Sequence, residues 1–268
     1  MKRVVVISDL QIPYHDKRAL RNVITFIGEY QPDEVIQIGD LNDYETPSRW
    51  NTGTYMEYAQ RVKIDSEVTK REFLGPLREV YSGPVGILEG NHDLRPRKYL
   101  ADKAPALAEF APDFHFSKLL DFEGFEVDLI PAFTKAGPGT VLIHGHEIKG
   151  MSQIAGTTAY NHASKAGANI VMGHTHRLGI RRQTSGNATT GYRTLWGFEV
   201  GHLMDPAKAQ YLGDGSVANW QKGFGLLYVG QYDVSPVAID VQRDGSFVVE
   251  GERYGAIKRG AGGRFAKK

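Results

Sequence analysis

The chain has 268 residues, of which 41% are hydrophobic and 24% are charged, and its formal net charge at pH 7 is +1. These values exclude a wholly disordered chain and a global charge that would attract nucleic acid or membranes, and the length allows one substantial core. Cysteine is absent, which excludes disulfides and thiolate metal ligands, so any bound metal must use nitrogen and oxygen donors.

Strands and helices are predicted to alternate through the first two thirds of the chain. In chain order the pattern predicts a strand at 4–7, a helix from Lys17 to Tyr30, a strand at 35–38, a long helix from Tyr55 to Tyr81, a strand at 85–88, a helix after Pro96, strands at 127–130 and 140–143, a helix from Thr157 to Gly167 and a strand at 169–172. This alternation is typical of parallel strands that helices bury on both faces. After residue 180, short segments separated by glycines predict a second sheet.

The two parts are not separated by a linker, so we expect one domain over residues 1–253. Residues 254–268 carry five basic and no acidic residues and are expected to form a flexible tail. Such a tail either binds RNA or DNA electrostatically or is a solvated end. The N-terminal apolar run is too short for an export signal, and no window approaches eighteen apolar residues. We therefore expect a cytoplasmic protein without membrane contact.

Polar residues follow five of the predicted strands directly. They are Asp9 after the first, Asp40 and Asp43 after the second, Asn91, His92 and Asp93 after the third, His144 and His146 after 140–143, and His174 and His176 after 169–172. Each group alone is typical of a cap, a turn or a surface pair. Ligands of α/β sheets bind at the carboxyl ends of the strands, however, so together these groups predict a single metal site.

The ordered motifs DLQ, GDLND, GNHD, HGH and GHTH resemble the calcineurin-like metallophosphoesterase superfamily, whose pattern is DxH, GDxxD, GNH followed by Asp or Glu, a later His, and GHxH. The resemblance covers residues 4–177 and looks closest to small stand-alone bacterial and phage members. It implies an α/β fold with a β-sandwich of two mixed sheets flanked by helices, in four layers. A phage-encoded chain of this kind would act in the cytoplasm of its bacterial host.

The resemblance also implies two divalent metal ions. One ion would be held by Asp9, Asp40 and His176, and the other by Asp40, Asn91, His144 and His174. Two ions about 3.5 to 4 Å apart can clamp a phosphate and activate a shared hydroxide. Mn²⁺ is favoured, with Mg²⁺, Fe²⁺, Ni²⁺, Co²⁺ or Zn²⁺ as alternatives.

Gln11 departs from the family pattern because it stands where relatives have histidine. Its amide oxygen either coordinates the first ion, hydrogen-bonds a water on that ion, or leaves the position to substrate. An oxygen ligand would move the preference of the site from Zn²⁺ toward Mn²⁺ or Mg²⁺.

By the same resemblance, His92 is the general acid for the leaving oxygen and Asp43 orients it. Arg95 is either a clamp on a phosphoryl oxygen or a solvated arginine at the start of a helix. Asp93 is expected to cap that helix, and His115 to lie in a sheet or the core.

Substrate contacts are expected from a small set of further residues. His146 either faces substrate or supports a metal ligand from behind. His15 is expected in a loop near the site, where it either contacts phosphate or has no contact with substrate. Tyr14, Tyr44, Arg49 and Trp50 follow the first two motifs and either stack a base or cover the backbone of their loops. His162 and His202 are candidates for the rim of the cleft.

The expected function is a phosphodiesterase that hydrolyses small phosphodiesters or (cyclic) nucleotides by attack of a metal-bridging hydroxide. The alternative is a metal-dependent nuclease on RNA or DNA. A phosphoprotein phosphatase and a non-catalytic scaffold of the same fold are less favoured. Loss of the histidine in NHD would be the signature of a scaffold, and His92 is present.

Overall fold

A six-stranded mixed sheet is built around β1 (Lys2–Ile7) in the computed structural model, which describes residues 1–189, 191–208 and 218–255. Its strands lie in the order β11 (Val234–Asp240), β10 (Gly223–Val229), β1, β2 (Glu34–Gln37), β3 (Val85–Ile87) and β4 (Asp128–Leu129). The four strands β1 to β4 run parallel, whereas β10 is antiparallel to both β1 and β11.

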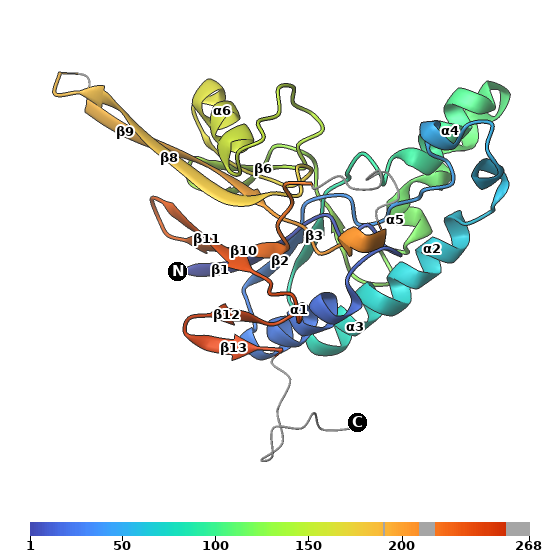
Figure 1. Cartoon of the computed structure of the whole chain (residues 1–268), viewed down its shortest axis with the longest axis horizontal. Coiled ribbons are helices and arrows are strands. Elements are labelled where there is room, and N and C mark those ends of the chain that lie inside the picture. The colour runs from blue at the N-terminus through green and yellow to red at the C-terminus, as the bar shows by residue number, and fades with distance from the viewer. Residues whose placement is uncertain (190, 209–217, 256–268) are drawn as a thin grey trace, which may run out of the picture.

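A second, five-stranded sheet faces the first (Figure 1). Its order is β5 (Thr134–Gly137), β6 (Thr140–Ile143), β7 (Asn169–Met172), β9 (Gly191–Val200) and β8 (Leu178–Asn187). The strands β6, β7 and β9 are parallel, and β5 and β8 pair antiparallel at the edges. A separate small hairpin joins β12 (Phe247–Val249) to β13 (Glu252–Tyr254).

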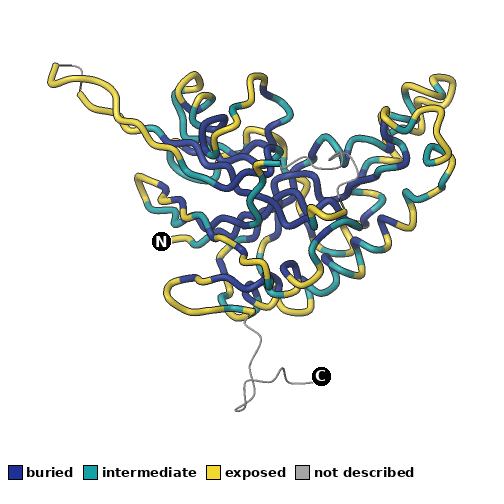
Figure 2. The backbone as a smooth tube through the Cα atoms, in the orientation of Figure 1, coloured by how far each residue is buried: buried dark blue, intermediate teal, exposed yellow. Residues whose placement is uncertain are grey.

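Successive residues of a strand point to opposite faces of its sheet, and β1 shows how this builds the layers. Val4 and Val6 lie in the core between the two sheets, whereas Val5 and Ile7 lie in the core under the helices. The helices α1 (Lys17–Tyr30), α2 (Val62–Thr69) and α3 (Gly75–Val80) supply that outer core, and α6 (Thr157–Ala166) covers the second sheet. Figure 2 shows the buried residues concentrated in these layers. The predicted four-layer α/β fold is thus confirmed.

The predicted long helix from Tyr55 to Tyr81 is wrong, because it is divided into several pieces. They are η2 (Tyr55–Tyr58), α2, a π-helical turn η3 (Lys70–Leu74) and α3. Pro76 has no N–H to bond the carbonyl four residues earlier, and the N–H of Gly75 bonds the carbonyl of Lys70 instead, five residues back.

The remaining helices are short. They are η1 (Arg49–Asn51), α4 (Arg95–Lys103), η4 (Pro105–Phe114), α5 (Phe116–Leu119) and η5 (Pro206–Lys208). None of the helices in the described part of the chain combines the length and the apolarity that a membrane crossing requires.

A second sheet is present, as the segments after residue 180 predicted, but these segments are divided between the two sheets. The strands β8 and β9 extend the sheet that β6 and β7 begin, and β10 returns to pair with β1, where Val5 lies opposite Leu226. Local sequence patterns identify a strand but not its partner, and these pairings join distant segments. The predicted buried strand at 127–130 is only Asp128–Leu129, because it lies exposed at the edge of its sheet.

The boundary of the predicted tail also needs correction. Tyr254 belongs to β13, and its ring lies 4.8 Å from that of Phe26 and 5.7 Å from that of Phe247. The domain therefore includes Tyr254. The rest of the predicted tail, residues 256–268, lies outside the described residues.

Candidate metal centre

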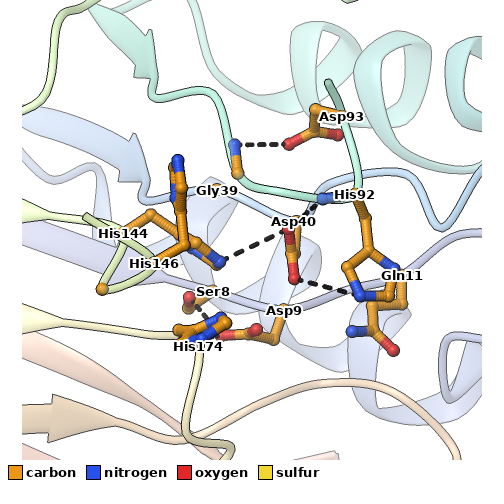
Figure 3. Close-up of polar contacts among 12 residues, drawn as sticks. Ser8, Asp9, Gln11, Gly39, Asp40, His92, Asp93, His144, His146 and His174 are labelled. Carbon is orange, nitrogen blue, oxygen red and sulfur yellow. Dashed lines mark hydrogen bonds and ion pairs between the residues drawn. The ribbon is translucent and has the colours of Figure 1, made fainter. Parts of the chain in front are cut away.

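The loops that follow β1, β2, β3, β6 and β7 bring their polar side chains together in one place (Figure 3). Three of these strands belong to the first sheet and two to the second. The predicted convergence of the strand ends is therefore found, but it arises where two sheets meet and not within one open sheet.

The backbone of this region is unusual. Five of its candidate ligand residues have positive φ angles, namely Asp9 (49°), Gln11 (47°), Asp40 (53°), His174 (65°) and His176 (57°). Such left-handed conformations cost energy for residues with a Cβ, and they cluster at functional sites. Sequence analysis had no signal for this feature.

His144 is held in one orientation at the second metal position. Its Nδ1 lies 2.8 Å from the carbonyl oxygen of Ile38, so Nδ1–H donates there and leaves Nε2 as the ligand atom. Nε2 lies 3.3 Å from Oδ1 of Asp40 and has no hydrogen-bond partner among the described residues. A side chain at Gly39 would place its Cβ 2.4 Å from Nδ1 of His144, so only glycine permits this contact.

His174 and Asn91 are the two further donors at the second metal position. Ligand atoms of Asp40, His144 and His174 all lie within 4.8 Å of one another. Oδ1 of Asn91 is buried and also lacks a hydrogen-bond partner within the described ranges. An unpaired buried oxygen is costly unless something else, such as a cation, takes its lone pairs.

Asp9 anchors the first metal position. Its Oδ2 accepts hydrogen bonds from the hydroxyl of Ser8 at 2.5 Å and from the backbone N–H of His174 at 2.9 Å. Its Oδ1 is buried, lies 3.2 Å from Nε2 of His176 and has no hydrogen-bond partner in the part of the chain that the structure describes.

Gln11 lies at this same metal position, as its place in the first motif predicted. It is 1% exposed, and its Nε2 is 3.2 Å from Nε2 of His176. Rotation of the amide by 180° would exchange Nε2 with Oε1 and bring an oxygen ligand beside Asp9 and His176. The site thus has the geometry for coordination by Gln11 and equally for a hydrogen bond to a water.

The donor set fits two divalent cations that share Asp40. Burial alone would raise the pKa of Asp40, but His144 and His92 hold it well below its ordinary value, so the carboxylate is ionised. Unpartnered buried oxygens and nitrogens surround it on both sides, and all donors are nitrogen or oxygen. These atoms suit Mn²⁺, Fe²⁺, Zn²⁺ and similar ions without selecting one.

His92, Asp43 and Arg95 form a connected group beside Asp40. Nδ1 of His92 lies 2.7 Å from Oδ1 of Asp43, and its Nε2 lies 3.7 Å from Oδ2 of Asp40. Arg95 donates to the backbone carbonyl of Asp43 at 2.7 Å, and its Nη2 is 3.1 Å from Nε2 of His92. With a side chain only 19% exposed, Arg95 is not the solvated arginine of the alternative interpretation.

Asp93 does not cap the helix that follows it, so that prediction is wrong. Its carboxylate accepts the backbone N–H groups of Leu41, Asn42 and Gly90, at 3.3, 2.9 and 2.9 Å. The helix α4 has Leu94 at its N-cap and no side-chain cap. Asp93 instead ties the loop that carries Asp40 to the loop that carries Asn91.

Glu199 is a functional candidate that sequence analysis missed. This fully buried carboxylate accepts the backbone N–H groups of Thr158 and Ala159, at 2.8 and 3.3 Å, and the hydroxyl of Thr175 at 2.8 Å. Thr175 stands between His174 and His176, so Glu199 fixes the loop that presents both. A single acidic residue inside the apolar strand WGFEV was the available signal.

A cavity of about 710 Å³ opens above these groups. Its lining includes Gln11, Tyr14, Asp40, Asp43, Glu45, Ser48, Trp50, Asn51, His92, Arg95, His174, His176, Met204, Lys208 and Trp220. Tyr14 is therefore placed where substrate contact was predicted. Sequence analysis did not assign Trp220 or Lys208 to the site, since both are distant from the motifs in sequence.

Four predicted substrate contacts are absent from the described lining of this cavity. His15 is 1% exposed and its Nε2 lies 3.1 Å from Glu72, so it faces the protein interior. His162 lies on α6, which covers the outer face of the second sheet. His202 is buried with its ring 5.3 Å from that of His176, and the partly exposed His146 has its ring 5.4 Å from that of His144. The position of His146 beside His144 agrees with the alternative in which His146 packs against a metal ligand and does not contact substrate.

The prediction that His115 lies in a sheet or the core is wrong as well. Its Nδ1 accepts the backbone N–H of Ser117 at 3.2 Å, so it caps α5, and its side chain is 21% exposed.

The chain is similar to several known proteins. The Gene 54 proteins of Mycobacterium phages L5 and D29 are each 51% identical to the chain, over 252 and 253 residues, which is 93% of this chain and 97% of each relative. Among solved structures, a Vps29 single mutant from Entamoeba histolytica is similar with a TM-score of 0.45 and 16% identity, covering 94% of this chain and 97% of that one. Residues 2–229 match the family described as calcineurin-like phosphoesterase, and the chain therefore belongs to that family.

Proposed function

We propose that this protein is a metal-dependent phosphodiesterase that hydrolyses small phosphodiesters or (cyclic) nucleotides. The observation that supports it most is the pairing of His92 with Asp43 beside the buried, incompletely bonded donors around Asp40. Two divalent cations bound there would hold the phosphoryl oxygens and supply the attacking hydroxide. Family membership supports a phosphoester hydrolase, and the diester specificity is part of the proposal.

His92 would protonate the leaving oxygen from Nε2, the ring nitrogen on the side of Asp40. Asp43 would accept a hydrogen bond from Nδ1–H and thereby keep the ring in orientation. Protonated Nε2 and the guanidinium of Arg95 are both donors, so the two cannot stay hydrogen-bonded when His92 is charged. Arg95 would then turn to a phosphoryl oxygen, which supports its role as a clamp.

The size of the cavity leaves room for an organic group beside the phosphate. Its volume of about 710 Å³ lies within the range of sites for drug-sized ligands, of roughly 300–1,000 Å³, and far exceeds the needs of a phosphate group alone. Mn²⁺ is the proposed metal, since the Gln11 amide, once rotated, would add an oxygen donor to the first position. The phage relatives support a role in the cytoplasm of a bacterial host.

A nuclease acting on RNA or DNA is the second candidate, and one surface feature favours it. The hairpin of β8 and β9 projects from the body of the molecule (Figure 1). It carries Arg181, Arg182 and Arg193, and residues 178–198 contain no acidic side chain. Together with the basic residues of 256–268, this hairpin offers charges for a polynucleotide backbone. A phosphoprotein phosphatase or a non-catalytic scaffold has no comparable support.

The test is a hydrolysis screen of protein that has been stripped of metal by a chelator and then supplied with Mn²⁺. Bis(4-nitrophenyl) phosphate, 4-nitrophenyl phosphate, a 2′,3′-cyclic nucleotide, and single-stranded RNA and DNA cover the candidate classes. We expect metal-dependent hydrolysis with the diesters preferred, and no turnover in Asp40→Asn.

Asp33→Asn is the matched control, since Asp33 precedes β2 and lies at the opposite end of that strand from Asp40. Full activity without metal, or in Asp40→Asn, would contradict the metal-dependent scheme. Preference for the monoester would remove the phosphodiesterase assignment, and preference for RNA or DNA would favour the nuclease.

A further inference from the structure

The cavity continues from the general acid along the segment 43–51. Asp43 contacts His92, and Glu45, Ser48, Trp50 and Asn51 from the same segment line the cavity. A general acid protonates the leaving oxygen, so the leaving group lies beside His92. The segment 43–51 is therefore the wall that a leaving group would face.

Trp50 is the conspicuous residue of this wall. Its side chain lines the cavity, yet the residue is 75% exposed. The guanidinium of Arg49 lies 4.7 Å from the centroid of the indole ring and covers part of it with a cation. Exposing so large an apolar side chain to water is unfavourable, and a bound ligand that covers the ring would remove this cost.

The turn that presents Trp50 is fixed by hydrogen bonds. The buried Ser48 accepts the backbone N–H of Trp50 on its Oγ at 3.4 Å, and the backbone N–H of Asn51 bonds the carbonyl of Ser48 at 3.0 Å. The side chain of Asn51 donates to the carbonyl of Glu45 at 2.8 Å. The indole is thus held at the cavity by a defined turn.

We propose that Trp50 stacks the base of a nucleoside leaving group, and this inference rests on the proposed phosphodiesterase function. An indole with a guanidinium on one side is a good stacking surface for a planar heterocycle. Ser48 and Asn51 line the same cavity as Trp50 and give its wall polar as well as aromatic character. The substrate class is thereby narrowed to nucleotide diesters, with Arg95 and Lys208 in the same cavity available to phosphate oxygens.

The experiment compares a thymidine dinucleotide with two analogues in which one sugar or the other carries no base, using Mn²⁺-supplemented protein. The products identify which nucleoside leaves. We expect Trp50→Ala to lower kcat/KM about 5- to 140-fold on the dinucleotide, the effect of losing one stacked base. The rate on the analogue without the leaving base should not change.

Two variants serve as controls. Trp50→Phe keeps an aromatic ring and should retain most of the activity. Tyr55→Ala removes a ring that is 82% exposed but is not among the cavity residues, and it should behave as wild type. Equal losses on all three diesters, or no loss in Trp50→Ala, would overturn the stacking proposal while the phosphodiesterase assignment stands.

A binding measurement separates this proposal from the proposed function. By calorimetry, thymidine 5′-monophosphate should bind Trp50→Ala more weakly than wild type, and deoxyribose 5-phosphate should bind both equally. If no diester is hydrolysed, the phosphodiesterase assignment fails, and this comparison still decides whether Trp50 holds a base. Equal binding of the monophosphate to both proteins would overturn the stacking.

Discussion

The two metal positions that share Asp40 differ in how firmly their other ligands are held. At the second position the imidazole of His144 is fixed by the Ile38 carbonyl and by contact with Gly39. At the first position Nδ1 of His176 is buried but has no partner among the described residues, and Gln11 can present either end of its amide. The imidazole at the second position is therefore fixed by a hydrogen bond on its second nitrogen, whereas the imidazole at the first position is held by ring packing against Trp220 and His202.

This difference has a consequence for metal affinity. A histidine that donates its second ring N–H to a carbonyl is a better oriented and more basic ligand than one without such a bond. An amide oxygen in place of imidazole also weakens the binding of Zn²⁺ more than that of Mn²⁺ or Mg²⁺. We infer a firmly held cation at the second position and an exchangeable one at the first.

Removal of His92 should have the largest effect on turnover while leaving the two positions as they are. His92→Ala should slow the hydrolysis of alkyl esters by about 10²- to 10⁴-fold, because a poor leaving group needs a proton. Esters of 4-nitrophenol should be affected much less. Metal content measured by elemental analysis should equal that of wild type, and a loss of metal would show that His92 acts as a ligand or a structural residue.

Removing one histidine from each metal position should affect the two bound ions differently. His144→Ala should weaken Mn²⁺ binding by more than about 100-fold at the tight position, since it removes an oriented ligand. His176→Ala should affect only the weak position. Equilibrium dialysis at several Mn²⁺ concentrations distinguishes the two. If both variants lose the same class of bound metal, the positions are not distinct.

Glu199→Gln should produce an intermediate effect, because Glu199 orients the loop that carries His174 and His176 through Thr175. Glutamine would place an NH₂ group opposite N–H and O–H groups that now donate hydrogen bonds to the carboxylate. Because these bonds orient the loop, we expect about a 10-fold loss of Mn²⁺ affinity. Glu252→Gln, on exposed β13, is the control. A lower melting temperature with unchanged metal affinity would assign Glu199 a purely structural role.

The smallest effect is expected from the basic C-terminal residues. A chain that ends at Gly255 keeps Tyr254 in β13 and should hydrolyse small diesters at the wild-type rate. Its affinity for nucleic acid should fall, with a shallower dependence on salt, because five cationic residues are removed. Filter binding at several salt concentrations measures this. An unchanged slope would make residues 256–268 irrelevant to nucleic-acid binding.

The sequence predicted the features that depend on neighbouring residues, namely the positions of the strands and of the polar residues at their ends. The apolar runs located β1, β2, β3, β6 and β7, and the polar residues at their ends located the site, because parallel strands place their carboxyl ends together. The pairing of β1 with β10 joins segments more than two hundred residues apart, and no local pattern encodes it. Similarly, the roles of Asp93 and Glu199 depend on backbone N–H groups of distant loops.

Calorimetric titration of metal-free protein with Mn²⁺, for wild type and Gln11→His, tests the inequality of the two positions most directly. Wild type should bind two ions with clearly different affinities. Gln11→His should tighten only the weaker one and raise its preference for Zn²⁺ over Mn²⁺. Two equal sites in wild type, or a Gln11→His variant with unchanged affinities and metal preference, would contradict this account.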